Sequence, residues 1–198
     1  MSKISIELIQ ELREKTGLGI MDCKKALIET EGNIAKSIEL LRKKGSLIAE
    51  KRGSNQTSQG IIYSYIHSGS KIGVLIEINC ETDFVANTDV IKNLAHNIAM
   101  HIAAMKPLCI SEADVDSTLL EKEKDIYTAQ LRNEKKPEQI IANIIEGKVK
   151  KFYSDNCLLY QNFIKNDQMT ITDLIKDTIA KVGENVKINR FTRYEIGA

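Results

Sequence analysis

The sequence predicts an α+β fold: an N-terminal three-helix bundle, then a core with a three-stranded antiparallel sheet, packed helices and a projecting helical hairpin. Three observations lead there. Residues 1–45 show apolar positions at helical spacing, residues 72–81 alternate with period two, and helical spacing returns between residues 90 and 182. The 198 residues, 42% hydrophobic and 28% charged, suffice for one medium domain or for a small and a larger one.

Three short helices are expected in the first 45 residues. Asp22 and Asn33 stand where they would cap the second and third helix, while Gly17 and Gly45 stand where the first and third would end. Each helix presents one apolar stripe, and the stripes contain Leu8, Ile9 and Leu12, then Cys23, Ala26 and Leu27, then Ile34, Ile38 and Leu41. Helices this short are unstable alone, so they are predicted to form a small bundle.

A polar stretch, residues 52–59, reads as a linker between two domains at residues 1–52 and 53–198. The loop that joins the first two helices is unusual because Ile20 and Met21 are apolar where a loop is normally polar.

The sheet is predicted from a hairpin and a final strand. Residues 60–67 and 72–81 form the hairpin around a turn at 68–71, and residues 186–196 form the third strand. In the second strand every other residue is apolar, which indicates one buried face, and these residues are Ile72, Val74, Ile76, Ile78 and Cys80.

The remaining segments predict further helices. Residues 90–103 repeat apolar pairs every four positions until Pro107 ends the helix. A charge-laced helix before Pro137 and a second helix after it predict an antiparallel hairpin over about residues 111–151. Residues 152–163 are expected to be irregular and extended, and residues 171–182 helical.

Charge and cysteine content narrow the range of possible functions and cellular compartments. The net charge of +1, from 28 basic and 27 acidic residues, argues against a dedicated nucleic-acid or membrane-surface binder. The four cysteines form no CxxC pair, which is typical of free thiols in a reducing compartment. No apolar run approaches the roughly 20 residues that span a bilayer, and the first residues lack a signal-peptide core. We therefore expect a cytoplasmic protein.

No constellation of catalytic residues, metal ligands or cofactor contacts is visible. The sequence lacks a phosphate-binding GxxxxGK[ST] loop. His96 and His101, five residues apart, do not share a helix face as a metal-binding pair would. Cys157 has no activating partner in its sequence neighbourhood.

The segment Thr82-Asp83-Phe84-Val85 stands where the second strand gives way to a helix. In one interpretation Asp83 caps a helical turn and Phe84 and Val85 pack beneath it. In the other, an acid and an aromatic residue are displayed for a partner, because buried aromatic anchors dominate the energetics of many interfaces. Both interpretations remain open at this point.

Three separated motifs resemble the elongation factor Ts family. They are Glu11–Gly17 followed by Ile20–Leu27, then Glu77–Ala86, and finally Gly183–Ile188, in the order in which the family carries them. The resemblance implies an N-terminal module similar to a ubiquitin-associated domain. It also implies a guanine-nucleotide exchange factor that binds elongation factor Tu and promotes GDP release, without a chemical step of its own and without direct nucleic-acid binding.

By the same resemblance, Thr82, Asp83, Phe84 and Val85 would disturb the Mg²⁺ region of elongation factor Tu, with Phe84 as a wedge. The N-terminal module would dock through three residues, which are Arg13, Ile20 and Met21.

Two departures from the family pattern bear on this expectation. Asn87 stands where many relatives carry a basic residue, which removes a cation beside Asp83. The chain is also shorter than the long members, which suggests a homodimer that presents the full surface with two copies. An alternative function is a helical adaptor that binds partners through its N-terminal module alone.

Overall fold

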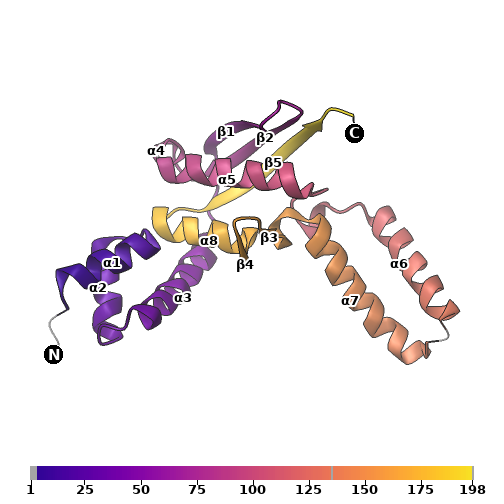
Figure 1. Cartoon of the computed structure of the whole chain (residues 1–198), viewed down its shortest axis with the longest axis horizontal. Coiled ribbons are helices and arrows are strands. Elements are labelled where there is room, and N and C mark those ends of the chain that lie inside the picture. Colours follow the sequence, from indigo (N-terminus) through magenta and orange to yellow (C-terminus); the bar gives the residue numbers. More distant parts are fainter. Residues whose placement is uncertain (1–3, 135, 198) are drawn as a thin grey trace. The chain divides into compact units, whose positions relative to one another are not determined.

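The computed structural model describes residues 4–134 and 136–197, and it confirms the α+β class (Figure 1). The elements in chain order are α1 (Ile6–Thr16), α2 (Ile20–Glu29), α3 (Ile34–Arg52), β1 (Gln59–Ile66), β2 (Ile72–Cys80), α4 (Asp83–Ala86), α5 (Asp89–Met105), η1 (Glu112–Asp114), α6 (Ser117–Asn133), α7 (Glu138–Asn156), η2 (Leu158–Tyr160), β3 (Asn162–Phe163), β4 (Asn166–Thr170), α8 (Ile171–Val182) and β5 (Val186–Glu195). Within the described residues, no helix is both long and apolar enough to cross a membrane.

The predicted three-stranded antiparallel sheet is present, and its strands lie in the order β1-β2-β5. On β2 the expected alternation is present, with Val74, Ile76, Ile78 and Cys80 all buried. In β1, the Tyr63 hydroxyl lies 3.1 Å from Nδ1 of His96 on α5, and the two rings meet edge to face. The first turns of α5 therefore pack on the sheet.

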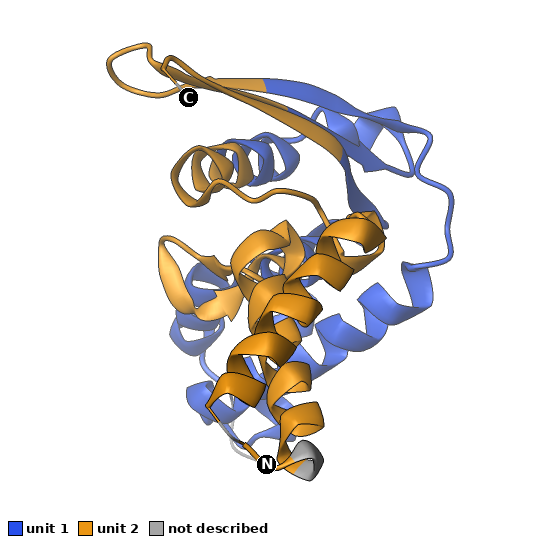
Figure 2. Cartoon of the chain, turned by 90° about the vertical axis from the view of Figure 1, so that its right-hand side faces the viewer, with its two compact units in different colours: residues 1–63, 76–96, 173–189 blue, residues 64–75, 97–172, 190–198 orange. Residues whose placement is uncertain are grey.

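Contacts divide the chain into two compact units (Figure 2). Unit 1 holds residues up to 63 together with 76–96 and 173–189, and unit 2 holds residues 64–75, 97–172 and 190 onward. The boundary between residues 52 and 53, expected from the polar linker, stays a prediction.

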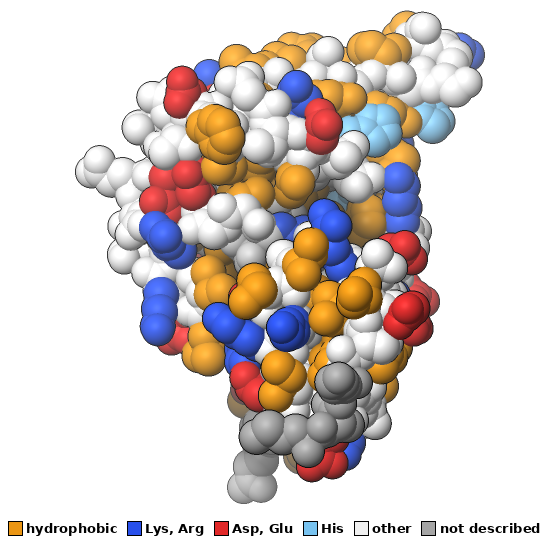
Figure 3. Space-filling model, turned by 90° about the vertical axis from the view of Figure 1, so that its left-hand side faces the viewer, with side chains coloured by type: hydrophobic (Ala, Val, Ile, Leu, Met, Phe, Trp, Pro, Cys, Tyr) orange, Lys and Arg blue, Asp and Glu red, His pale blue; other side chains and the backbone are white. Residues whose placement is uncertain are grey.

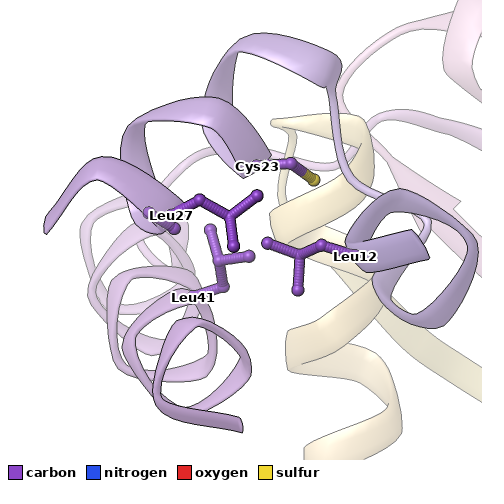
Figure 4. Packing of buried hydrophobic residues seen from close by; sticks show 5 residues of the cluster. Leu12, Cys23, Leu27 and Leu41 are labelled. Atoms are coloured by element: carbon purple, nitrogen blue, oxygen red, sulfur yellow. The ribbon is translucent and has the colours of Figure 1, made fainter. Parts of the chain in front are cut away.

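The N-terminal helices of unit 1 form the predicted bundle. Its buried cluster contains Leu12, Cys23, Ala26, Leu27 and Leu41. The side chains of Leu12, Cys23, Leu27 and Leu41 point toward one another (Figure 4). Asn33 caps α3 as predicted, because its side-chain oxygen accepts a hydrogen bond of 3.0 Å from the Lys36 N–H. Gly17 ends α1 in the left-handed conformation with φ of 68°, which glycine adopts at little cost.

Two predictions about these helices are wrong. Gly45 does not end the third helix, because α3 continues to Arg52. A Cβ at this position would lie only 2.9 Å from Cβ of Ala180 on α8, so the glycine serves close helix packing. Asp22 does not cap α2 either; the cap position is Gly19, and Asp22 lies in the first turn, where an acid favours the helix dipole.

Unit 2 contains the helical hairpin, α6 with α7, and one correction. Residues 152–163 are not simply irregular, because α7 continues to Asn156 and is followed by η2 and a short β3–β4 hairpin. Helices α6 and α7 pack on each other. Leu131 on α6 and Ile141 on α7 are buried, and Nζ of Lys148 lies 4.7 Å from the centre of the Tyr127 ring. Pro137 stands at the N-cap of α7, where no N–H bond is lost.

Gly60 on β1 offers a stability prediction. A Cβ there would collide with the backbone oxygen of Ile78 and lie 2.8 Å from Cα of Asn79, so β2 leaves no room for a side chain. We expect Gly60→Ala to lower the free energy of unfolding by about 2 kcal/mol in urea titration. Gly147→Ala is the matched control, since Gly147 lies in α7 with no neighbour within 4 Å. That substitution should raise stability by about 0.5–1 kcal/mol, because alanine is the better helix former. Equal effects at both positions would contradict this account.

His101 on α5 is a buried polar residue of unit 2. Its Nδ1 accepts a hydrogen bond of 3.3 Å from the Ile164 N–H, which leaves Nε2 to donate to Oε1 of Gln161 at 3.0 Å. The Gln161 amide is oriented in turn by a 2.7 Å bond to the Asp155 carbonyl. Burial lowers the pKa of His101, because the charged imidazolium would lose its hydration.

This histidine predicts acid sensitivity. A folded-state pKa below the usual 6.5 means that the unfolded state binds the proton first. The contribution of His101 to the free energy of unfolding is therefore fully present above about pH 6.5. It falls as the pH drops below that value, by up to about 1.4 kcal/mol per pH unit. Urea titrations at several pH values should show this slope, and His101→Gln should abolish it. His67→Asn is the control, because His67 lies exposed beside the β1–β2 turn.

Candidate partner-binding site

The segment between β2 and α5 folds as the single-turn helix α4. Thr82 is its N-cap, and the Thr82 hydroxyl accepts a hydrogen bond of 3.3 Å from the Val85 N–H. Asp83 is the first helical residue, so the interpretation of Asp83 as the cap is wrong. Asn87 closes the other end, where its side-chain amide donates a 2.9 Å bond to the Asp83 carbonyl.

Phe84 and Val85 point in opposite directions. Phe84 is 80% exposed, whereas Val85 is 6% and Ala86 3% exposed. The expectation that Phe84 packs beneath the helix is therefore wrong, and for Val85 it is confirmed. A large aromatic side chain that is exposed to water adds little to the stability of the core. Its exposure therefore favours a role for Phe84 in binding.

The turn between α8 and β5 supports α4 from one side. Both carboxylate oxygens of Glu184 accept bonds from Thr82, one from its N–H at 3.0 Å and one from its hydroxyl at 2.8 Å. Beneath them, the buried Cys80 thiol donates to the Thr82 carbonyl at 3.1 Å. Burial, followed by the charge of Glu184, raises the pKa of Cys80, so the thiol stays protonated and can donate.

Glu81 forms a second set of bonds beside the first. One of its oxygens accepts a 2.7 Å bond from the Asn185 N–H, and the other accepts from the Asn55 side chain at 3.0 Å and Arg52 at 3.3 Å. The Asn185 N–H bond is the largest cause that lowers the pKa of Glu81, with smaller contributions from Asn55 and Arg52. The buried Asn185 side chain also donates to the Asn55 carbonyl at 2.9 Å. These contacts join the ends of α3 and β2 to the start of β5.

The other predicted contact residues lie on the N-terminal helices. Arg13 on α1 is exposed. The expectation that Ile20 and Met21 lie in the loop is wrong, because they begin α2, where they are 54% and 61% exposed. On the side of the molecule shown in Figure 3, hydrophobic side chains lie among basic and acidic ones. Neighbouring apolar side chains that are exposed to water are typical of a protein-binding surface.

Other parts of the chain offer less for chemistry. A groove between α3 and α8 encloses about 120 Å³, which is small beside the 300–1,000 Å³ of typical ligand pockets. Asp177 lines it, and burial raises the pKa of this carboxyl against the opposing charges of Arg42 and Lys181. Among the described side chains, no three His, Cys, Asp or Glu residues converge as metal ligands.

Comparison with known proteins identifies the family. A family model described as Elongation factor TS matches residues 21–198. Elongation factor Ts of Fervidobacterium nodosum is 52% identical over 195 residues, which covers 98% of this chain and 99% of that protein. The chain belongs to the elongation factor Ts family.

Two further elongation factor Ts proteins support this assignment. The one from Thermotoga maritima is 53% identical over 195 residues, and the one from Thermoanaerobacter pseudethanolicus is 51% identical over 194. Each match covers 98% of this chain, with 97% and 95% of the relatives. Elongation factor Ts proteins belong to translation elongation, so this chain is a translation elongation factor of protein biosynthesis.

Sequence reasoning missed the residues that support α4. Glu184 and Asn185 appeared only as part of the closing motif of the elongation factor Ts resemblance. Their partners Thr82 and Glu81 are 102 and 104 residues away. No local pattern reports a contact over such a separation.

Proposed function

We propose that the protein is a guanine-nucleotide exchange factor for elongation factor Tu, the partner that elongation factor Ts implies. The observation that carries the proposal is Phe84, an aromatic side chain with 80% exposure on a one-turn helix whose next residue is buried. The chain would bind the GDP-bound partner, release GDP and leave the site free for GTP.

The mechanism follows from linkage. GDP is held in a GTPase through phosphate contacts and Mg²⁺. A protein that prefers the nucleotide-free state weakens nucleotide binding by the same factor by which nucleotide weakens its own binding. Phe84 would insert between partner side chains near the Mg²⁺ site and Asp83 would meet polar groups beside it, with Thr82 and the buried Val85 holding the turn. No covalent bond is made or broken, so the protein is not an enzyme in the chemical sense.

The N-terminal module would supply docking affinity. Arg13 provides a guanidinium group, while Ile20 and Met21 provide apolar area that is exposed in the free protein. Burial of such side chains at an interface contributes about 25 cal/mol for each Å² of apolar surface. Docking here and wedging at Phe84 are separable roles.

The deciding experiment mixes the protein with elongation factor Tu that carries a fluorescent GDP, in an excess of unlabelled GDP. The expected result is release that accelerates with protein concentration and then saturates. Release no faster than in buffer would overturn the exchange function.

The adaptor alternative rests on the same exposed Ile20 and Met21. An adaptor would bind a partner through this module whether or not nucleotide is present. Titration of elongation factor Tu with and without GDP distinguishes the two, since an exchange factor binds the nucleotide-free form more tightly.

We also propose that the chain forms a homodimer. On unit 2, Ile66 and Leu75 are 63% and 47% exposed, and Ile66 lies 3.2 Å from where a Cβ on Gly73 would stand. This places both side chains on the face of the β1–β2 hairpin opposite the buried Val74 and Ile76. Sedimentation equilibrium should give twice the mass of 22.2 kDa, and Leu75→Asp should give the monomer. A monomeric wild-type chain would overturn this proposal.

A further inference from the structure

The helix α4 is too short to define its own orientation. It contains four residues, fewer than the roughly 12 that an isolated helix needs for marginal stability in water. Its most exposed residue, Phe84, contributes little packing. Some contact outside the helix must therefore set the direction in which Phe84 points.

The burial of Val85 and Ala86 anchors one side of the helix, and Glu184 contacts its start with both carboxylate oxygens. The bonds of 3.0 Å and 2.8 Å reach the N–H and the hydroxyl of the same residue, Thr82. Two bonds to one residue fix its rotation as well as its position, and bonds to an ionised carboxylate are stronger than neutral ones. The Thr82 hydroxyl also accepts a hydrogen bond from the Val85 N–H, so the group that Glu184 contacts is the same group that caps the helix.

The support is itself held in place. The residue after Glu184, Asn185, is buried and donates its N–H to Glu81 at 2.7 Å. Glu81 stands one residue before Thr82. Glu81 thus accepts a bond from the α8–β5 turn, while Glu184 of that turn accepts bonds from Thr82 at the start of α4. The α8–β5 turn and the start of α4 are thereby joined by hydrogen bonds in both directions.

We propose that Glu184 is a positioning residue for exchange: it holds α4 so that Phe84 meets the partner in a defined orientation. This inference rests on the proposed exchange function. Glu184 need not touch the partner or the nucleotide, because it acts through Thr82. Its loss should therefore lower the maximal rate of GDP release and leave docking by the N-terminal module nearly unchanged.

The kinetic test compares Glu184→Ala and Glu184→Gln with the wild-type protein over a range of concentrations. Glu184→Ala should lower the maximal release rate about tenfold, with less than a threefold change in the half-saturating concentration. Glu184→Gln keeps one acceptor oxygen and should recover part of the rate. Glu50→Ala, which removes an exposed acid on α3, is the control and should behave as wild type. Maximal release at the wild-type rate in Glu184→Ala would overturn the proposal.

A double-substitution cycle tests whether the effect passes through Phe84. If Glu184 acts by orienting that ring, adding Glu184→Ala to Phe84→Ala should slow release by less than twofold. A full tenfold further loss would show that Glu184 acts independently of Phe84, against the proposal.

A measurement on the free protein separates this inference from the exchange function. The chain contains no tryptophan, so Phe84→Trp introduces a single tryptophan as a reporter on α4. Its anisotropy should fall when Glu184→Ala or Glu184→Gln is added, while thermal unfolding confirms that each variant is folded. Unchanged anisotropy in both folded variants would overturn the positioning role. A fall in anisotropy, with no exchange by the wild-type chain, would support positioning and reject the exchange function.

Discussion

Replacing Phe84 with alanine is expected to slow GDP release from elongation factor Tu about 100-fold. An aromatic anchor that is fully desolvated at an interface contributes about 2–4 kcal/mol, and 2.7 kcal/mol corresponds to a factor of 100. The folded protein should lose almost nothing, since Phe84 is 80% exposed and its removal leaves no cavity. The measurement is the saturating release rate, together with a urea titration of the free variant.

Two companion variants sharpen this result. Phe84→Leu keeps apolar volume and should recover part of the rate. Ile126→Ala removes an exposed apolar side chain of α6, 49% exposed, and should leave release unchanged. If Phe84→Ala releases GDP at the wild-type rate, the wedge role is wrong even where exchange itself is observed.

Replacing Ile20 and Met21 together with serine should weaken docking about 100-fold without slowing the saturated reaction. Both side chains are more than half exposed, so the free energy of unfolding should change by under about 0.5 kcal/mol. Their burial at an interface is worth roughly 1.5 kcal/mol each. A plot of release rate against protein concentration should therefore shift to higher concentration and reach the same plateau.

The matched control for docking is Leu47→Ser, which removes an apolar side chain with 56% exposure from α3. We expect its half-saturating concentration to equal that of the wild type. A lower plateau in the Ile20 and Met21 variant would instead mean that the module takes part in the exchange step, which the proposed division of roles excludes.

Regular elements were predictable where the local pattern matched the tertiary environment. The alternation of β2 reports its one buried face, and α8 spans residues 171–182 as predicted because Gly183 ends it with φ of 74°. The prediction that Gly45 ends the third helix is wrong because glycine occurs both where helices end and where helices pack closely. Only the position of Ala180 on another helix decides between them.

The position of the candidate site in the sequence could be predicted, but which of its side chains are buried could not. Residues 82–85 stand out because a strand pattern ends there, yet four residues are too few for a helical period to show which side chain is buried. The separation of Phe84 from Val85 accompanies the cap at Thr82, whose hydroxyl also bonds to the distant Glu184, and a local pattern shows neither contact. The docking residues Arg13, Ile20 and Met21, taken from the family resemblance, remain predictions.

The bond between Thr82 and Glu184 has a consequence for the order in which parts of the protein form during synthesis. The two residues are 102 positions apart, and the second lies near the C-terminal end of the chain. Closing so long a loop is a late step, because its entropy is lost before any contact compensates for it. On a ribosome, the N-terminal bundle can form as soon as it emerges, since all its helices are local in sequence. The contact between Glu184 and Thr82, in contrast, waits until α8 and its following turn have been synthesised, so a nascent chain can form its proposed docking surface before its proposed exchange surface is complete.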